Sequence, residues 1–290
     1  MSAHTLALVL AGAVCHALWN IVAKRAAGGT LFVWLFGCVS VAAAAPVALV
    51  AWHVQPQTFD GWMWLAVLAS ALVHVVYLLV LQKGYRVGDF AVIYPMARGT
   101  GPLLAVLGAV VLLGEMPSAL GWLGVALVLA GVCMTAGGAA GITIHSDAQR
   151  RRRGVLWGAF TGACIAGYTV LDGWAVKSLG MAPVLFYAAS LVFRSVLLAP
   201  WALHSRSALR GQWRQHRTAI VLVGVLSPLA YCLVLFAVQT APLSYVAPVR
   251  EMSMLIGTLM GARLLKESLK PSQVLGAALM LLGVAGLALA

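Results

Sequence analysis

The sequence is poor in charged residues. They make up 9% of its 290 residues, with only seven acidic side chains, whereas a soluble domain carries about 25% charged residues. Hydrophobic residues account for 62% of the chain, and the mean hydropathy is +0.98. So little polar surface excludes an ordinary water-soluble domain and predicts an integral membrane protein that has the lipid bilayer as its surroundings.

Motifs of common enzymes and metal sites are also missing. The chain has no HExxH, GxSxG, GxGxxG or Walker-type sequence, which argues against a hydrolase, a dehydrogenase or a nucleotide-driven pump. The five cysteines have no CxxC or CxxH spacing, so we expect buried small side chains rather than disulfides or metal ligands. The sequence predicts no catalytic residue, no cofactor and no metal site.

What the chain does contain is a series of long apolar segments. A helix needs about 20 such residues to cross a hydrocarbon core about 30 Å thick. Lipid cannot satisfy exposed backbone polar groups, which favours helices throughout and predicts an all-α fold. Ten segments meet this length, at about residues 4–23, 30–52, 62–82, 90–113, 118–140, 154–176, 182–203, 218–239, 243–262 and 271–290.

The second half of the chain repeats the first. Residues 89–131 resemble residues 241–283 at an offset of 152, and YLLVL at Tyr77 matches YCLVL at Tyr231. Each copy holds five segments, and an odd number makes the second copy enter the membrane from the opposite side. We therefore predict two inverted five-helix repeats, 1–144 and 154–290, joined by a basic linker, 145–153. Such halves place a substrate site near the midplane and permit alternating access.

The basic residues indicate how the chain is oriented. Sixteen of the 19 Lys and Arg residues lie between segments, and 15 of these fall in the connections 1–2, 3–4, 5–6, 7–8 and 9–10; Lys177 alone lies on the other face. The positive-inside rule makes the basic face cytoplasmic and both termini extracytoplasmic. It also accounts for the net charge of +12 and for the arginines at 150–153, so we expect no nucleic acid partner.

Five charged residues lie inside the predicted segments: Arg98, Asp172, Arg194, Arg250 and Glu251. A charge at this depth costs at least about 2.5 kcal/mol and usually serves a pathway. The repeat superposes Arg98 on Arg250, and nearby prolines can open the helical backbone there. The alternative is that each arginine snorkels toward the membrane surface, or pairs with Glu251 or Asp172 as a fixed strut.

Helical spacing brings further polar and aromatic residues onto the same faces as these charges. For each aromatic residue or histidine, ordinary packing is the alternative. Three positive against two negative charges favour an anionic or zwitterionic substrate. Transport is either coupled to a proton, for which Asp172, Glu251 and His74 are the candidates because they are titratable groups at membrane depth, or it proceeds by substrate exchange or facilitated diffusion. The predicted substrate-binding residues are Arg98, Arg250, Tyr94, His16, Trp19, Asn20, His74, Tyr77, Tyr168, Tyr187 and Arg194.

Two further features recur in both copies. Glu115 and Glu267 each precede the next segment by about three residues, which predicts helix-start caps. Glycines recur in the segments that follow them, which predicts close helix packing. They are Gly121, Gly124, Gly131, Gly276, Gly283 and Gly286.

The whole duplicated pattern resembles the EamA-like branch of the drug/metabolite transporter superfamily. The resemblance lies in YPMARGTGPLL and a terminal LLGE with a Gly-rich helix after it, then APVREMSMLIGTLMGARLLKE and a second such helix. It implies a secondary carrier of small metabolites, often amino acids or related compounds, in the bacterial inner membrane. It differs from many relatives in having no basic residues in the termini or the 2–3 connection.

Two other classes of protein could use the same buried charges. One is a polytopic membrane enzyme or a lipid scramblase, which would act without two sealed compartments. The other is a structural membrane subunit, for which the inverted duplication has no evident use. A monomer is sufficient for the carrier that we expect.

Overall fold

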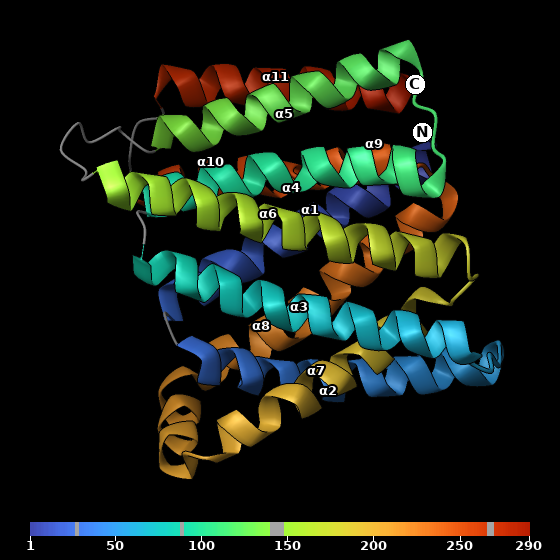
Figure 1. Cartoon of the computed structure of the whole chain (residues 1–290), viewed down its shortest axis with the longest axis vertical. Helices are drawn as coiled ribbons and strands as arrows, with labels where there is room; N and C mark the ends of the chain where they lie inside the picture. The colour runs from blue at the N-terminus through green and yellow to red at the C-terminus, as the bar shows by residue number, and fades with distance from the viewer. Residues whose placement is uncertain (27–28, 88–89, 140–147, 266–269) are drawn as a thin grey trace.

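The structure, a computed structural model, describes residues 1–26, 29–87, 90–139, 148–265 and 270–290. Within these ranges it contains helices and no strand (Figure 1). Nine of the described helices are long and apolar enough to cross a membrane, and α9 with α10 forms a tenth, broken span. The all-α membrane fold is confirmed. The helices are α1 (Ala3–Ala26), α2 (Gly29–Val54), α3 (Gly61–Val87), α4 (Phe90–Leu113), α5 (Ala119–Ala139), α6 (Ala148–Lys177), α7 (Pro183–Leu203), α8 (Arg206–Thr240), α9 (Leu243–Arg250), α10 (Met252–Leu265) and α11 (Pro271–Leu289).

Two helices begin earlier than hydropathy predicts. Helix α8 starts at Arg206 instead of residue 218 and has non-helical dihedral angles at His216 (φ −126°, ψ 17°). Helix α6 starts at Ala148 and includes the arginines 150–153, so the predicted basic linker is helical from Ala148 onward. Arg, Ala and Gln are good helix formers, and hydropathy cannot detect a helix that continues beyond the hydrocarbon. Residues 145–147 lie outside the described ranges.

The ninth predicted segment, 243–262, is not one continuous helix. It breaks at Glu251, whose N–H donates to Pro248 O (2.9 Å) while its own carbonyl accepts from Met254 N (2.8 Å). Pro248 has no N–H to give and disturbs the preceding turn. The break leaves Arg250 at the carboxyl end of α9 and Glu251 at the amino end of α10, where each charge suits the helix dipole.

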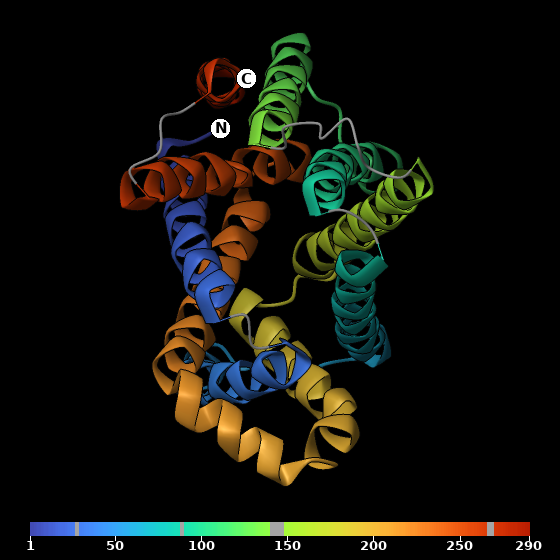
Figure 2. The same cartoon turned by 90° about the vertical axis from the view of Figure 1, so that its left-hand side faces the viewer.

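The helices pack in a pattern that the two repeats share. Helix α1 packs against α8, and its counterpart α6 packs against α3, which is the counterpart of α8. Helix α4 packs on α6, and its counterpart, the pair α9 and α10, packs on α1. The counterpart helices α2 and α7 contact each other, as do α5 and α11. Figure 2 shows these two pairs at opposite edges of the molecule. Such exchange of partners is what two inverted halves produce.

Both chain ends lie on one face, as ten spans require. The Met1 ammonium donates to Ala288 O at 3.1 Å, and the two ends are adjacent in Figure 1. We call this the terminal face. The other face carries the carboxyl ends of α1, α3 and α7 and the amino ends of α2, α4 and α8, and we call it the basic face. That the terminal face is extracytoplasmic stays a prediction.

Helices α5 and α11 meet through glycines, as predicted. A Cβ atom added to Gly131 would lie 2.5 Å from Gly276 O, and one added to Gly124 would lie 2.9 Å from Gly283 O. Hydrogen at these positions lets the two backbones approach closely, which is how helices associate in lipid. The repeats are therefore joined along one edge by backbone contact.

Candidate functional site

A cavity of about 240 Å³ lies between the two repeats. A water molecule takes about 30 Å³ in the liquid, so the cavity has room for a small metabolite. Its lining comes from the carboxyl halves of α1 and α3, the amino ends of α2 and α4, the middle of α6, α7 and α8, and the last residue of α9. It therefore extends from the middle of the bundle toward the basic face.

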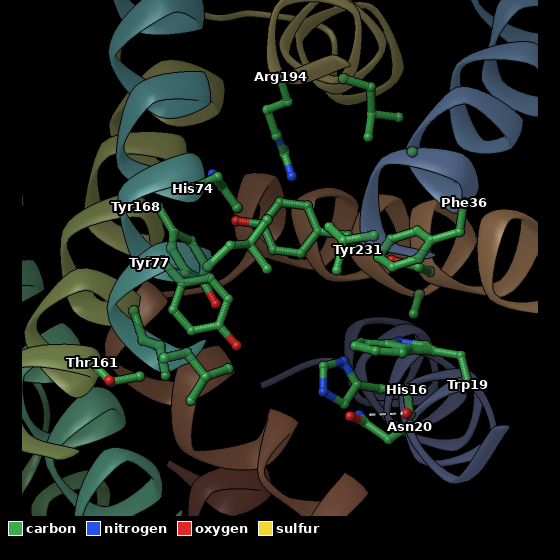
Figure 3. Close-up of a pocket in the computed structure, with 18 of the residues that line it drawn as sticks. His16, Trp19, Asn20, Phe36, His74, Tyr77, Thr161, Tyr168, Arg194 and Tyr231 are labelled. Atoms are coloured by element: carbon green, nitrogen blue, oxygen red, sulfur yellow. Dashed lines mark hydrogen bonds between the residues drawn. The ribbon is translucent and has the colours of Figure 1, made fainter. Parts of the chain in front are cut away.

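The structure gathers all eleven predicted substrate-binding residues around this one cavity. Figure 3 shows seven of them with their neighbours. Of the three proton-exchange candidates, His74 lines the cavity, but Asp172 and Glu251 do not. The predicted substrate-binding residues found in its lining are His16, Trp19, Asn20, His74, Tyr77, Tyr94, Arg98, Tyr168, Tyr187, Arg194 and Arg250.

Arg98 and Arg250 approach each other, as the duplication predicts, and share one carboxylate. Arg98 Nη1 lies 2.9 Å from Glu251 Oε2, and Arg250 Nε lies 3.9 Å from Glu251 Oε1. The Glu251 side chain is 1% exposed. The pair Arg98–Glu251 connects α4 of the first repeat to the helix break of the second, so it has the geometry of a strut beside the cavity.

Arg194 has a different environment. Its Nε and Nη2 both donate to Ser190 Oγ at 3.2 Å, and its guanidinium carbon lies 4.9 Å from the centre of the Tyr187 ring. No Asp or Glu among the described residues lies within ion-pair distance of it. Arg194 thus brings a positive charge to the cavity wall without a carboxylate partner in the described part of the chain.

Aromatic rings form two walls of the cavity. On one side His74 stacks on Tyr168 with ring centres 4.0 Å apart, and Tyr77 lies 5.7 Å from Tyr168. Across the cavity His16 and Trp19 are 4.9 Å apart, while Arg194 points in from α7 (Figure 3). Offset or edge-to-face ring pairs at 4.5 to 7 Å are the favourable ones.

Tyr231 connects the aromatic wall to a buried acid. Its ring centre lies 4.7 Å from that of Tyr187, and its hydroxyl donates to Asp172 Oδ2 at 2.5 Å. Asp172 is fully buried, and its Oδ1 has no hydrogen-bond partner among the described residues. Sequence reasoning missed Tyr231 as a site residue, although the repeat had matched it to Tyr77, a predicted one.

His74 and Asn20 are held by local hydrogen bonds. His74 Nδ1 lies 2.9 Å from Ser70 O, and since a carbonyl only accepts, Nδ1 carries the proton and Nε2 is left as the acceptor. Asn20 Nδ2 donates to His16 O at 2.8 Å. Both side chains are therefore oriented before any ligand binds.

The terminal face is closed by Glu115. This residue follows Gly114, whose φ of +68° ends α4, and it caps α9 of the other repeat rather than the α5 that follows it. Glu115 Oε1 accepts from Leu243 N (2.7 Å), and Oε2 accepts from Ser244 N (2.8 Å). Lys177 Nζ donates to Oε1 at 2.9 Å. We call these contacts the terminal-face latch; Glu267 lies outside the described residues.

Charge and hydrogen bonding compete at Glu115. Burial of the carboxyl raises its pKa, but the hydrogen bonds from Lys177 and from the Ser244 and Leu243 backbone outweigh burial and lower the pKa overall. The cap of α5 is instead Ser118, whose Oγ accepts from Gly121 N at 3.1 Å.

Other polar contacts reinforce the closure of the terminal face between the repeats. Gln57 donates to Gly180 O (2.8 Å) and accepts from Ala182 N (2.9 Å). Thr5 and Thr240 join their hydroxyls at 3.0 Å. The cavity is thus blocked on one side by contacts that cross from repeat to repeat.

Comparison with known proteins gives one family. The model of the EamA-like transporter family matches residues 4–137 and 152–289. The uncharacterized transporter YwfM of Bacillus subtilis (strain 168) is 26% identical over 241 residues, covering 81% of this chain and 77% of YwfM. A solved crystal structure with 17% identity superposes with a TM-score of 0.76, covering 97% of each chain, and shows a shared fold.

Proposed function

The chain belongs to the EamA-like transporter family and is a multi-pass membrane transporter, and we propose that it moves a small anionic or zwitterionic solute by alternating access. The membrane is the bacterial inner membrane. The substrate occupies the cavity between the repeats, with its acidic group on Arg194 and the aromatic walls around the rest. Arg98 and Arg250 stay tied to Glu251 beside it.

The observation that supports this substrate charge best is the environment of Arg194. A cation at this depth is costly unless an anion compensates it, and in the described part of the chain no carboxylate lies within ion-pair distance of Arg194. Glu251 is occupied by the other two arginines. A substrate carboxylate can supply the missing charge with two parallel hydrogen bonds to the planar guanidinium.

Alternating access follows from where the cavity is open and closed. The cavity reaches toward the basic face, while the terminal-face latch and its neighbouring contacts hold the repeats together on the other side. Two inverted halves can rock against each other around a site between them. In our proposal the latch opens in the opposite state, and the substrate leaves past α9.

For coupling, we propose that Asp172 exchanges a proton. One oxygen of its carboxyl group has no hydrogen-bond partner in the described part of the chain, and Tyr231 bridges the other to the cavity rings. Glu251 suits this role less well because its carboxyl group already contacts two arginines. His74, whose ring stacks on Tyr168 in the cavity wall, is the second candidate for proton exchange.

The experiment uses purified protein in detergent and in proteoliposomes. Amino acids, carboxylates, phosphonates and amines are screened for a rise in melting temperature, since a ligand of the native state raises apparent stability. We expect acids to stabilise the protein and to be taken up. Arg194→Gln should weaken uptake by about 10- to 100-fold, the value of a charged hydrogen bond, and Arg194→Lys should retain part of it.

Arg210→Gln serves as the matched control, because Arg210 is exposed on α8 away from the cavity. Unchanged uptake by folded Arg194→Gln would contradict the proposal. Chemical turnover of a stabilising ligand in detergent, where no second compartment exists, would favour a membrane enzyme instead.

A further inference from the structure

We infer that the cavity selects carboxylates with a planar aromatic body over saturated carboxylates and over aromatic amines. This inference rests on the proposed anion transport and names its substrate class. Three observations carry it: the seat of Arg194, the two ring walls, and the absence of a free carboxylate on the described cavity lining.

The seat of Arg194 fixes the direction of its guanidinium. Two of its nitrogen atoms bind Ser190 Oγ, and its plane is held near the Tyr187 ring. Ser190 is fully buried, so the Arg194 side chain is held by a fixed partner and does not move freely in solvent. In Figure 3 Arg194 points from α7 toward the rings of Tyr231 and His74. A ligand whose carboxylate group binds Arg194 would therefore have the rest of its structure among these rings.

The rings around that body come from helices that are remote in sequence. Tyr77 and His74 belong to α3, Tyr168 to α6 and Tyr231 to α8, and their centres lie 4.0 to 6.2 Å from one or more of the others. Trp19 stands on α1 at the other side. A planar aromatic body can meet ring faces and edges on both sides, whereas a puckered saturated ring offers no π-surface to them.

The charges of the lining disfavour amines. An aromatic ammonium would gain cation–π contact with the tyrosines, but it would also meet Arg194. Glu251 and Asp172 are both absent from the lining, Glu251 being bound to Arg98 and Asp172 lying behind Tyr231. The described lining therefore offers an ammonium no carboxylate partner.

Three probes of similar size separate these features. Benzoate is aromatic and anionic, cyclohexanecarboxylate is anionic but saturated, and benzylamine is aromatic but cationic. Binding is measured by calorimetry on the full-length protein, and uptake by counterflow in proteoliposomes. We expect benzoate to bind about three- to tenfold more tightly than cyclohexanecarboxylate, as one or two ring pairs would give, and benzylamine not to compete.

Variants at Tyr168 assign the preference to a ring. Tyr168→Leu should bring benzoate down to the affinity of cyclohexanecarboxylate, while Tyr168→Phe, which keeps the ring and removes the hydroxyl, should retain the preference. Each variant is first checked for a single gel-filtration peak and a normal melting temperature. If Tyr168→Leu fails this check, Tyr77→Leu and Tyr77→Phe replace the pair.

The results distinguish the aromatic preference from the anion transport on which it rests. Equal binding of benzoate and cyclohexanecarboxylate, both lost in Arg194→Gln, overturns the aromatic preference and leaves anion transport intact. Tighter binding of benzylamine, or binding of neither acid, overturns the inference; anion transport itself is then judged by the wider screen of acids.

Discussion

Replacing Glu115 by alanine tests whether the terminal-face latch keeps one side of the transporter closed. The change removes the acceptor of two N–H groups of α9 and the partner of Lys177. Losing a helix cap costs about 0.5 to 2 kcal/mol, and a charged hydrogen bond is worth about 1.5 to 3 kcal/mol. The Glu115 side chain is 9% exposed. While the face is closed, water can therefore replace few of the hydrogen bonds that Glu115→Ala removes.

We therefore expect the closed state to lose about 2 to 3 kcal/mol relative to the open one. At about 1.4 kcal/mol per factor of ten, the open population rises about 30- to 140-fold. The reporter is Ser244→Cys in a variant without the five native cysteines. Ser244 is fully buried at the latch, so an impermeant maleimide added to the terminal face should label it only when that face opens.

Asp60→Ala provides the matched control for this experiment. Asp60 also caps a helix near the terminal face, where its Oδ1 accepts from Met63 N at 2.8 Å, but this contact stays within the first repeat. It should lower the melting temperature without speeding the labelling of Ser244→Cys. If Glu115→Ala and Asp60→Ala label at the same slow rate, Glu115 is a structural cap and the latch has no part in closure.

Acid should open the same latch. The pKa of Glu115 is lower in the closed state than its ordinary value of about 4.3. The latch therefore gives its full stabilisation above the ordinary pKa and loses it as the pH falls through the lowered one. Labelling of Ser244→Cys should rise below about pH 4, and Glu115→Gln, which does not titrate, should remove this pH dependence.

Three further outcomes are expected. Gly131→Ala should lower the melting temperature, because its Cβ would lie 2.5 Å from Gly276 O on α11, whereas Gly257→Ala, with no atom within 4 Å, should not. Arg98→Gln and Glu251→Gln should each destabilise the protein by about 3 kcal/mol, and the double variant should be more stable than their sum predicts; additive losses would refute the strut. Asp172→Asn should end acceleration of uptake by a pH gradient but preserve substrate exchange, measured in the same proteoliposomes.

Much of the candidate site could be predicted because its residues share helical faces. Tyr94 and Arg98 stand four residues apart and Tyr187 and Arg194 seven, both of which are spacings along one helical face. In each pair the guanidinium lies over the ring, at 5.6 and 4.9 Å. Local spacing also placed His16 beside Trp19. Such neighbours follow from the helix period alone.

Pairings between helices could not be predicted in this way. The sequence shows three arginines and two acidic residues inside the segments, but not which of them pair. In the structure Glu251 contacts both Arg98 and Arg250, while Arg194 donates to Ser190. Tyr231 was missed because its importance comes from Asp172 on another helix. The contacts Arg98–Glu251 and Tyr231–Asp172 depend on how remote helices lie against each other, whereas Arg194 and Ser190 stand four residues apart on α7.

The sequence by itself determined the membrane location, the ten spans and the division into two repeats. Hydropathy is a sum over one segment, and the parity of five helices follows from counting them, so neither needs a tertiary structure. Only the tertiary structure decided that Glu115 caps α9 instead of α5 and that Glu251 pairs with Arg98 of the other repeat. These outcomes depend on distances between groups more than 120 residues apart in the chain, which no local pattern contains.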